Sequence, residues 1–181
     1  MKQSSIQEMT GSFRRKTLRW ASFDYQTPAI YFVTICTTDR QPLLGRVDPT
    51  GRLHPSRIGL HVSDAWYTLP DRFPSLDLIA FVAMPDHVHG ILDIGPVTDD
   101  RVKLTPGQVI STFKSVANHV TRQLDERAGR SGSMWQQGYH DRVVRSDDEL
   151  RQFEWYITEN PARWAASRMR AGEVDAAGDL A

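Results

Sequence analysis

The sequence predicts an α+β domain, with an antiparallel sheet and helices packed on one face. The apolar segments occur in the order strand, helix, strand, strand, helix, strand. Two of the strands are separated by a turn too short for any crossover, so they pair antiparallel. A chain of 181 residues builds one core rather than two. This order is the ferredoxin-like plan, and a helix after the fourth strand is extra to it.

The first half of the chain contains four of these elements. Residues 29–39, AIYFVTICTTD, are rich in β-branched and aromatic side chains and predict a buried strand. Residues 45–57 are rich in Gly, Pro and Asp and predict turns. Apolar residues recur at close to helical spacing over 56–70. Residues 76–86 and 87–94 are two apolar strands joined by a short Pro-Asp turn, which predicts a hairpin.

The second half supplies two helices and one strand. Residues 105–129 carry a single apolar stripe and begin with Thr and Pro, which is typical of a helix N-terminus. Residues 139–146 alternate in polarity and predict the fourth strand. Residues 146–161 begin with a serine cap and three acids, and we expect this helix to stop at Asn160-Pro161.

Composition and charge limit the class of protein. A formal net charge of zero argues against a protein that coats nucleic acid by charge alone. There is no apolar run of about 20 residues, and no apolar segment near Met1, so we expect a cytoplasmic protein without a membrane span. We expect residues 1–13 to form a disordered tail, residues 14–164 a single domain, and residues 165–181 a flexible tail.

Two histidines, His87 and His89, lie two residues apart on the third predicted strand. Strand side chains alternate, so both imidazoles point to one face and Val88 points to the other. Two neutral imidazoles at this spacing can bind one divalent cation, although they are also compatible with polar positions on a half-exposed strand. A pair is an incomplete metal site, so a third ligand must come from elsewhere.

Tyr156 and Asn160 are four residues apart in the last predicted helix and therefore share one helical face. An Asn carbonyl oxygen can ligate a hard cation. A Tyr hydroxyl beside a metal is a candidate nucleophile toward a phosphodiester. Each residue also has an ordinary structural explanation, packing for Tyr156 and a helix end before proline for Asn160. The spacing alone leaves both roles open.

Five separated segments occur in this chain in the same order as in a known family. They are RRKTLRWASFDYQTPAIYFVTICTTDRQPLLG, FVAMPDHVHGIL, FKSVANHVT, MWQQGYHDRVVRSDDEL and YITENPARW. Together they resemble the REP-associated tyrosine transposases, a branch of the single-tyrosine HUH transposases of the insertion-sequence type. Asp86 stands where many relatives have Asn, which we expect to matter little. His140 stands where relatives often have an aromatic residue, and it leaves Tyr139 as a rival tyrosine.

The resemblance implies the HUH nuclease fold, with the catalytic tyrosine on the extra C-terminal helix. It implies that His87, His89 and Asn160 bind the cofactor, Mg²⁺ or Mn²⁺, and that Tyr156 is the nucleophile. The implied reaction is metal-dependent cleavage and strand transfer of single-stranded DNA at hairpin-forming imperfect palindromes, through a covalent 5′-phosphotyrosine intermediate. The implied setting is the bacterial nucleoid, for a monomer or a homodimer.

Basic side chains are the candidate contacts to the DNA backbone. The candidates are Arg14, Arg15, Lys16, Arg19, Lys114, Arg142 and Arg145. Trp135 can stack on a base, but a loop tryptophan is more often a lid on the core, which is what we expect here.

Two other functions remain open from the sequence. A non-catalytic DNA or RNA hairpin-binding protein of ferredoxin-like fold would expose aromatic residues on central strands, and Tyr31 with Val33 is the available pair. A histidine-triad nucleotide hydrolase would need a third alternating histidine, and position 91 is Ile.

Overall fold

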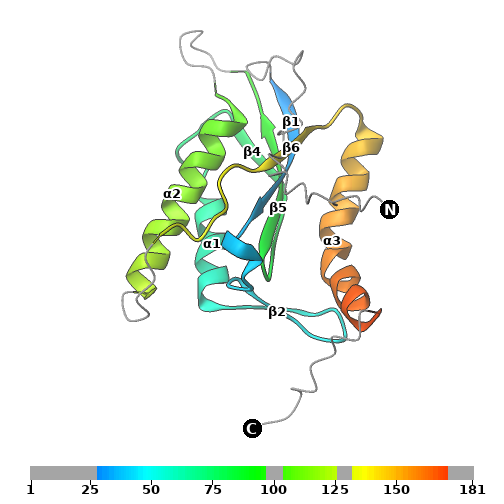
Figure 1. Cartoon of the computed structure of the whole chain (residues 1–181). Helices are drawn as coiled ribbons and strands as arrows, with labels where there is room; N and C mark the ends of the chain where they lie inside the picture. The colour runs from blue at the N-terminus through cyan, green and yellow to red at the C-terminus, as the bar shows by residue number, and fades with distance from the viewer. Residues whose placement is uncertain (1–27, 97–103, 126–131, 171–181) are drawn as a thin grey trace, which may run out of the picture.

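The fold is built around a four-stranded antiparallel sheet. A computed structural model describes residues 28–96, 104–125 and 132–170. The sheet order is β4-β5-β1-β6 (Figure 1). The strands are β1 (Ala29–Cys36), β4 (Leu76–Met84), β5 (His87–Ile94) and β6 (His140–Val143). This is the order of the ferredoxin-like plan, so the predicted fold class is confirmed.

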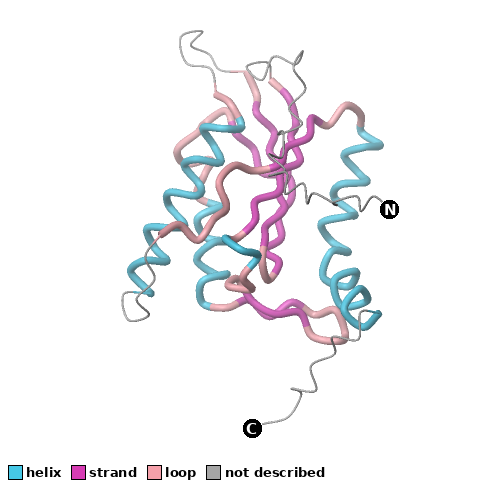
Figure 2. The backbone as a smooth tube through the Cα atoms, in the orientation of Figure 1, coloured by secondary structure: helices cyan, strands magenta, loops and turns pink. Residues whose placement is uncertain are grey.

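Helices cover both faces of the sheet. Helices α1 (Arg57–Tyr67) and α2 (Pro106–Asp125) lie on one face, as predicted, and α3 (Asp147–Arg170) crosses the other (Figures 1 and 2). Helix α3, which is additional to the ferredoxin-like plan, therefore forms a third layer. Within the described parts of the chain, every helix is too short or too polar to cross a bilayer.

The main core lies between the sheet and α1 and α2. Alternate residues of β1 point into it, and Tyr31 and Val33 are fully buried there. Trp66 of α1 packs edge-on against Phe113 of α2, with ring centroids 5.2 Å apart. Trp135 closes this core beside Phe113 and is only 3% exposed, as expected for a lid. This face is thus used for packing and leaves the other face for chemistry.

A small second sheet departs from the prediction of turns alone. Residues 45–57 contain β2 (Gly45–Val47) and β3 (Leu53–Pro55), paired antiparallel and preceded by the 3₁₀ turn η1 (Thr38–Arg40). Three-residue strands are too short to show a period of two, which is why the sequence did not reveal them. The hairpin lies beneath the C-terminal end of α3 (Figure 1). There the hairpin residue Gly51 closely approaches the backbone of Ala162.

The predicted stop at Asn160-Pro161 is wrong, because α3 continues through Pro161 to Arg170. Proline removes one backbone donor, which tertiary packing can outweigh. Trp164 packs on His87, with ring centroids 5.8 Å apart, and Ala165 is buried. Residues 165–170 are therefore helical, although a flexible tail was predicted from residue 165. Residues 1–13 and 171–181 lie outside the described residues.

The fourth strand is shorter than predicted, and the second helix is described over most of its predicted range. Strand β6 spans only four of the residues predicted over 139–146, because pairing with β1 ends at the Tyr31–Val143 register. Helix α2 is described to Asp125, and the rest of the predicted range, to residue 129, lies outside the described residues.

Gly90, in the middle of β5, has no room for a side chain. A Cβ there would lie 2.2 Å from the Trp66 ring, so we expect Gly90→Ala to lower the free energy of unfolding by roughly 1–3 kcal/mol. Chemical denaturation measures this change. Gly95→Ala is the matched control, because its Cβ would meet only the Ser75 carbonyl at 3.4 Å. Equal stability of the two variants would contradict the assigned packing.

Candidate active site

The two histidines open β5, immediately after the hairpin turn, and share the face of the sheet that α3 covers. Val88 points to the opposite face and is part of the main core, so the predicted alternation is confirmed. His87 is 6% exposed and His89 is 5% exposed. Their Nε2 atoms face each other 3.1 Å apart. The strand therefore brings two ring nitrogens to one point beside α3.

Asp86 orients the first imidazole. Its buried carboxylate bonds to Nδ1 of His87, and because a carboxylate only accepts, that nitrogen carries a proton; in the neutral imidazole this leaves the lone pair on Nε2. The other carboxylate oxygen pairs with Nε of Arg40 at 3.0 Å. The backbone carbonyl of Asp86 accepts two hydrogen bonds from Thr37, each 2.9 Å long. Asp86 is thus held through its carboxylate and through its backbone carbonyl.

Arg40, which pairs with Asp86, lies in a turn with an unusual backbone conformation. Asp39 and Arg40 both have left-handed conformations, with φ of 52° and 55°, which non-glycine residues rarely adopt. Such strain persists only where surrounding structure enforces it, and it is concentrated at functional sites. Here the turn brings the Arg40 guanidinium to Asp86, which is buried and would otherwise lack a countercharge.

Thr34 of β1 holds the second imidazole through a 2.8 Å contact between its hydroxyl and Nδ1 of His89. A hydroxyl can donate or accept, so either tautomer of His89 is satisfied without moving a side chain. Burial, with the nearby His87 and Arg40 charges, lowers the pKa of His89 to about 3, and Asp86 offsets this only partly. His89 is therefore neutral near pH 7, as a metal-binding imidazole must be.

Helix α3 presents one stripe of residues, spaced by three or four, to this face of the sheet. Phe153 stacks on Phe32 of β1, with ring centroids 4.4 Å apart. The Tyr156 ring meets the His89 ring edge-on at 5.1 Å. Trp164 covers His87, eight residues further along the helix. The stripe follows the i, i+3, i+4 rule for one helical face.

Asn160 lies on the same stripe, one turn after Tyr156 and one turn before Trp164. Its neighbours on the stripe contact His89 and His87 respectively, so helical geometry directs Asn160 toward the histidine pair. It is only 6% exposed. Burial of an amide in this position is unfavourable unless the amide finds a polar partner.

The donor set fits a divalent cation. Two nitrogen ligands at right angles, each about 2.1 Å from one ion, are about 3.0 Å apart, which is close to the observed Nε2 separation of 3.1 Å. Within the described residues, no cluster of three or more His, Cys, Asp or Glu side chains could complete such a site. An amide oxygen could supply a third ligand, and Asn160 is a buried amide on the helix face that contacts the histidine pair.

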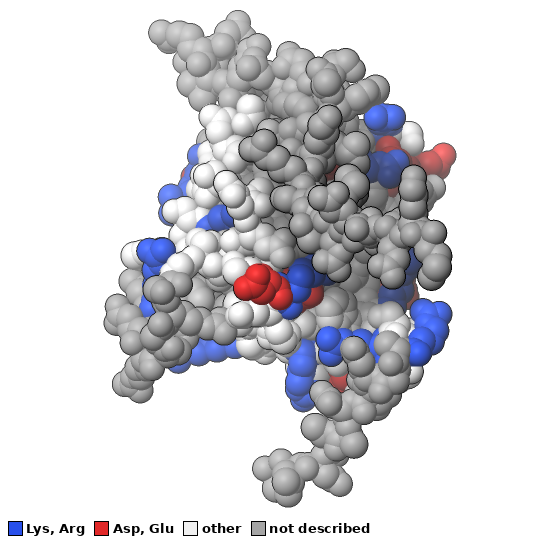
Figure 3. Space-filling model, in the orientation of Figure 1, with Lys and Arg blue, Asp and Glu red and all other residues white. Residues whose placement is uncertain are grey.

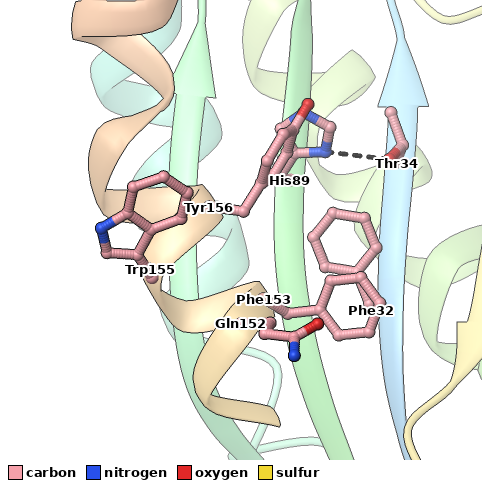
Figure 4. Close-up of a pocket in the computed structure, with 7 residues that line it drawn as sticks. All are labelled: Phe32, Thr34, His89, Gln152, Phe153, Trp155 and Tyr156. Atoms are coloured by element: carbon pink, nitrogen blue, oxygen red, sulfur yellow. Dashed lines mark hydrogen bonds between the residues drawn. The ribbon is translucent and has the colours of Figure 1, made fainter. Parts of the chain in front are cut away.

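A pocket of about 420 Å³ opens beside the histidine–tyrosine contact. Figure 4 shows its lining, which combines strand residues with one face of α3. The lining residues are Phe32, Thr34, His89, Gln152, Phe153, Trp155 and Tyr156. The Tyr156 hydroxyl lies beside the His89 ring in this view, at the opposite end of the pocket from Gln152 (Figure 4). The candidate nucleophile therefore borders a space large enough for part of a substrate.

The rival tyrosine, Tyr139, lies on the other side of the sheet. It packs against the main core, and its hydroxyl approaches Gly107 at the start of α2. It is therefore separated by the sheet from His87 and His89. Of the two tyrosines considered, Tyr156 alone contacts a histidine of the pair.

The predicted DNA contacts are scattered. The Lys114 amine donates to the carbonyls of Gln136 and Gly138, and burial lowers its pKa, which favours a structural role. Arg142 lies on the α3 side of the sheet, over the Phe153 ring and paired with Glu149. Arg145 precedes α3, and its backbone amide donates to Glu149. Four further candidates, Arg14, Arg15, Lys16 and Arg19, lie outside the described residues.

Several residues of the site carried no decisive signal in the sequence. At position 86 only the exchange of Asn for Asp was considered, and the structure shows that the Asp86 carboxylate contacts His87 directly. Thr34 and Phe32 share a face by strand alternation, but only the pairing of β1 with β5 sets Thr34 opposite His89. Arg40 is six residues beyond Thr34 and joins the site through a turn that no periodicity predicts.

Comparison with known proteins identifies the fold. No protein-family model matches the chain. An uncharacterised protein of Haemophilus influenzae is 25% identical over 175 residues, covering 88% of this chain and 94% of that one. A REP-associated tyrosine transposase, solved bound to a REP hairpin, is 19% identical with a TM-score of 0.56, over 76% of this chain and 68% of that one. A candidate transposase of Deinococcus radiodurans is also 19% identical, with a TM-score of 0.50, over 75% and 92%. The chain therefore has the fold of a REP-associated tyrosine transposase.

Proposed function

We propose that this protein is a metal-dependent single-stranded DNA endonuclease and strand transferase, which cleaves at hairpin-forming repeats through a covalent 5′-phosphotyrosine intermediate. The observation that carries the proposal is the contact between Tyr156 on α3 and His89 on β5, with ring centroids 5.1 Å apart. This contact brings the proposed nucleophile next to a pair of imidazoles that can bind a metal, although the tyrosine and the histidines are far apart in the sequence. The fold shared with a hairpin-bound tyrosine transposase supports the same proposal.

In the proposed reaction the Tyr156 oxygen attacks a phosphorus atom of the DNA backbone. A bond forms between this oxygen and phosphorus, and the bond from phosphorus to the 3′ oxygen breaks. The tyrosine proton passes to solvent, and the departing 3′ oxygen takes up a proton to become a hydroxyl. Since the phosphodiester energy is kept in the phosphotyrosine link, the 3′-hydroxyl of another strand can attack that link and rejoin DNA without ATP.

His87, His89 and Asn160 are the residues that would hold Mg²⁺ or Mn²⁺. When bound, the ion would polarise the scissile phosphate and stabilise charge on the leaving oxygen. The protein's own contribution is orientation: Asp86 and Thr34 fix the two imidazole rings, and the Phe153–Phe32 stack fixes the helix that carries Tyr156. These contacts are formed before any substrate binds.

A DNA partner is supported by the fold and by charge. The structural neighbour was solved with a REP hairpin. Helix α3 ends in Arg168 and Arg170, and basic side chains gather around this end of the helix (Figure 3). Backbone phosphates are the ligands such a surface prefers. The proposed partner is therefore single-stranded DNA that carries an imperfect-palindrome hairpin.

The alternative, a non-catalytic hairpin-binding protein, receives less support. Its sequence argument needs Tyr31 and Val33 exposed on the sheet, and both are fully buried under α1 and α2. It also gives no reason for a buried histidine pair held by a carboxylate and a hydroxyl.

Tyr156→Phe should abolish the covalent adduct, lowering its yield by about 10³-fold or more, because it removes the attacking oxygen. The ring packing on His89 is retained, so DNA affinity should change less than about twofold. The assay is a denaturing gel of protein with labelled hairpin oligonucleotides from repeats flanking its gene, with Mn²⁺ or with EDTA. Tyr139→Phe is the control and should keep the adduct. A labelled protein band that persists in Tyr156→Phe would reject the assignment.

Asp86→Ala should weaken Mn²⁺ binding by roughly 10–100-fold, because His87 loses the carboxylate that orients its ring. Asp86→Asn should lose less, since its amide oxygen can still accept from Nδ1. Calorimetric titration with Mn²⁺ measures both without any DNA. Asp64→Ala, at a carboxylate side chain that is 76% exposed on α1, is the control. An Asp86→Ala protein that binds Mn²⁺ as well as this control would contradict the role of Asp86.

A further inference from the structure

The pocket beside Tyr156 has a chemistry of its own. Four of its seven lining side chains are Phe, Trp or Tyr, and none is Asp, Glu, Lys or Arg. Its one histidine, His89, is held by the Thr34 hydroxyl of the same pocket. A space lined by aromatic faces and free of charged groups suits a flat, neutral, aromatic ligand and does not suit a phosphate. Among the parts of a nucleotide, only the base has this character.

A second hollow, which Trp155 also lines, provides a contrast. It has a volume of about 380 Å³ and is lined by Asp148, Arg151, Gln152 and Trp155. Asp148 and Arg151 form an exposed ion pair there, so this hollow carries charged side chains, which the pocket beside Tyr156 lacks. Gln152 and Trp155 line both spaces. A base that stacks on Trp155 therefore finds surroundings without acidic or basic side chains only in the pocket beside Tyr156.

Trp155 is the outer wall of the pocket and is 58% exposed. Figure 4 shows its indole on the opposite side of the pocket from Phe32 and Phe153. Large exposed aromatic side chains that line a groove are the usual stacking platforms for single-stranded nucleic acid. The exposure of Trp155 is unfavourable in the free protein and is explained if a base covers it.

We propose that this pocket binds the base of a nucleotide adjacent to the scissile phosphate, with Trp155 as its stacking platform and Gln152 as the residue that reads its edge. The inference rests on the proposed function for the identity of the ligand. The Tyr156 hydroxyl lies at one end of the pocket and Gln152 at the other, so a base inside it keeps its own phosphate near Tyr156. The Gln152 amide supplies a donor and an acceptor, which is what discrimination between bases requires.

In this proposal Arg163 lies where the DNA backbone leaves the pocket. Its guanidinium lies 5.6 Å from the centroid of the Trp155 ring and 5.4 Å from that of the Tyr156 ring. By contrast, Arg142 and Arg151 are paired with Glu149 and Asp148. A guanidinium between the stacking residue and the nucleophile is placed to contact the phosphate that joins a bound base to the cleaved bond.

Binding measured without divalent metal tests the pocket separately from the chemistry. The probe is a fluorescent hairpin oligonucleotide from the repeats flanking the gene, together with a set in which each single-stranded nucleotide in turn is abasic. Fluorescence anisotropy compares the full-length Tyr156→Phe protein with Tyr156→Phe/Trp155→Ala. We expect one abasic position to weaken binding by about 5- to 100-fold, and Trp155→Ala to weaken binding of the intact oligonucleotide by a similar factor.

The decisive observation is coupling between the two changes. At the position that fills the pocket, Trp155→Ala should cause no further loss with the abasic oligonucleotide, because the stacked base is already missing. Gln152→Ala should reduce base preference at that position by about fivefold or more and leave other positions unchanged. Tyr67→Ala is the matched control, because Tyr67 is 61% exposed on α1, away from the α3 face.

The pocket assignment is overturned if Trp155→Ala leaves every affinity within twofold of the parent, or weakens intact and abasic oligonucleotides equally at all positions. Lack of measurable binding by the parent protein also overturns it. Adduct formation by the wild-type protein with Mn²⁺ is scored in parallel. An adduct without coupling rejects the pocket and keeps the phosphotyrosine chemistry, whereas coupling without an adduct rejects the chemistry and keeps the pocket.

Discussion

The stack of Phe153 on Phe32 is the contact on which the candidate site depends, because it helps to hold α3 against the one face of the sheet that carries the histidines. The site has two halves that the chain supplies separately. The two imidazoles proposed to bind metal belong to β5, and Tyr156 and Asn160 belong to α3. Aromatic packing between a strand and a helix is directional as well as apolar, so it sets the rotation of the helix and thus which residues face the strand.

The proline in α3 shows how strongly packing dominates local preference in this region. A helix that ended before Pro161 would leave Asn160 in a frayed last turn and Trp164 outside the helix. Instead the helix continues, with Trp164 over His87 and Ala162 against the Gly51 turn of the small hairpin. The hairpin thus takes part in the site indirectly, by supporting the segment of α3 that carries Asn160 and Trp164.

Burial of polar groups is the second constraint. Asp86, His87, His89 and Asn160 are all less than a tenth exposed, and burying such groups is costly unless each finds a partner. Arg40 pairs with Asp86, the Asp86 carboxylate accepts from His87, and Thr34 contacts His89. Burying these polar groups costs stability but fixes the ring nitrogens in one place. This is typical of a site where ligand geometry matters more than stability.

The sequence alone determined the fold class, the shared face of His87 and His89, and the stripe that joins Tyr156 to Asn160. Each of these follows from a local period, two for a strand and 3.6 for a helix, and periods can be read without coordinates. The family resemblance added expected roles to those residues. Basic charge supplied the candidate DNA contacts in the first twenty residues, which lie outside the described structure.

Only the tertiary structure decided which tyrosine faces the histidines, that Asp86 and Arg40 form one unit with His87, and that α3 passes through Pro161. It also decided that an aromatic pocket without charged groups lies beside Tyr156. These features join residues tens of positions apart, or override a local preference by packing. Their free energies come from contacts between elements, and no period along the chain encodes which elements will meet.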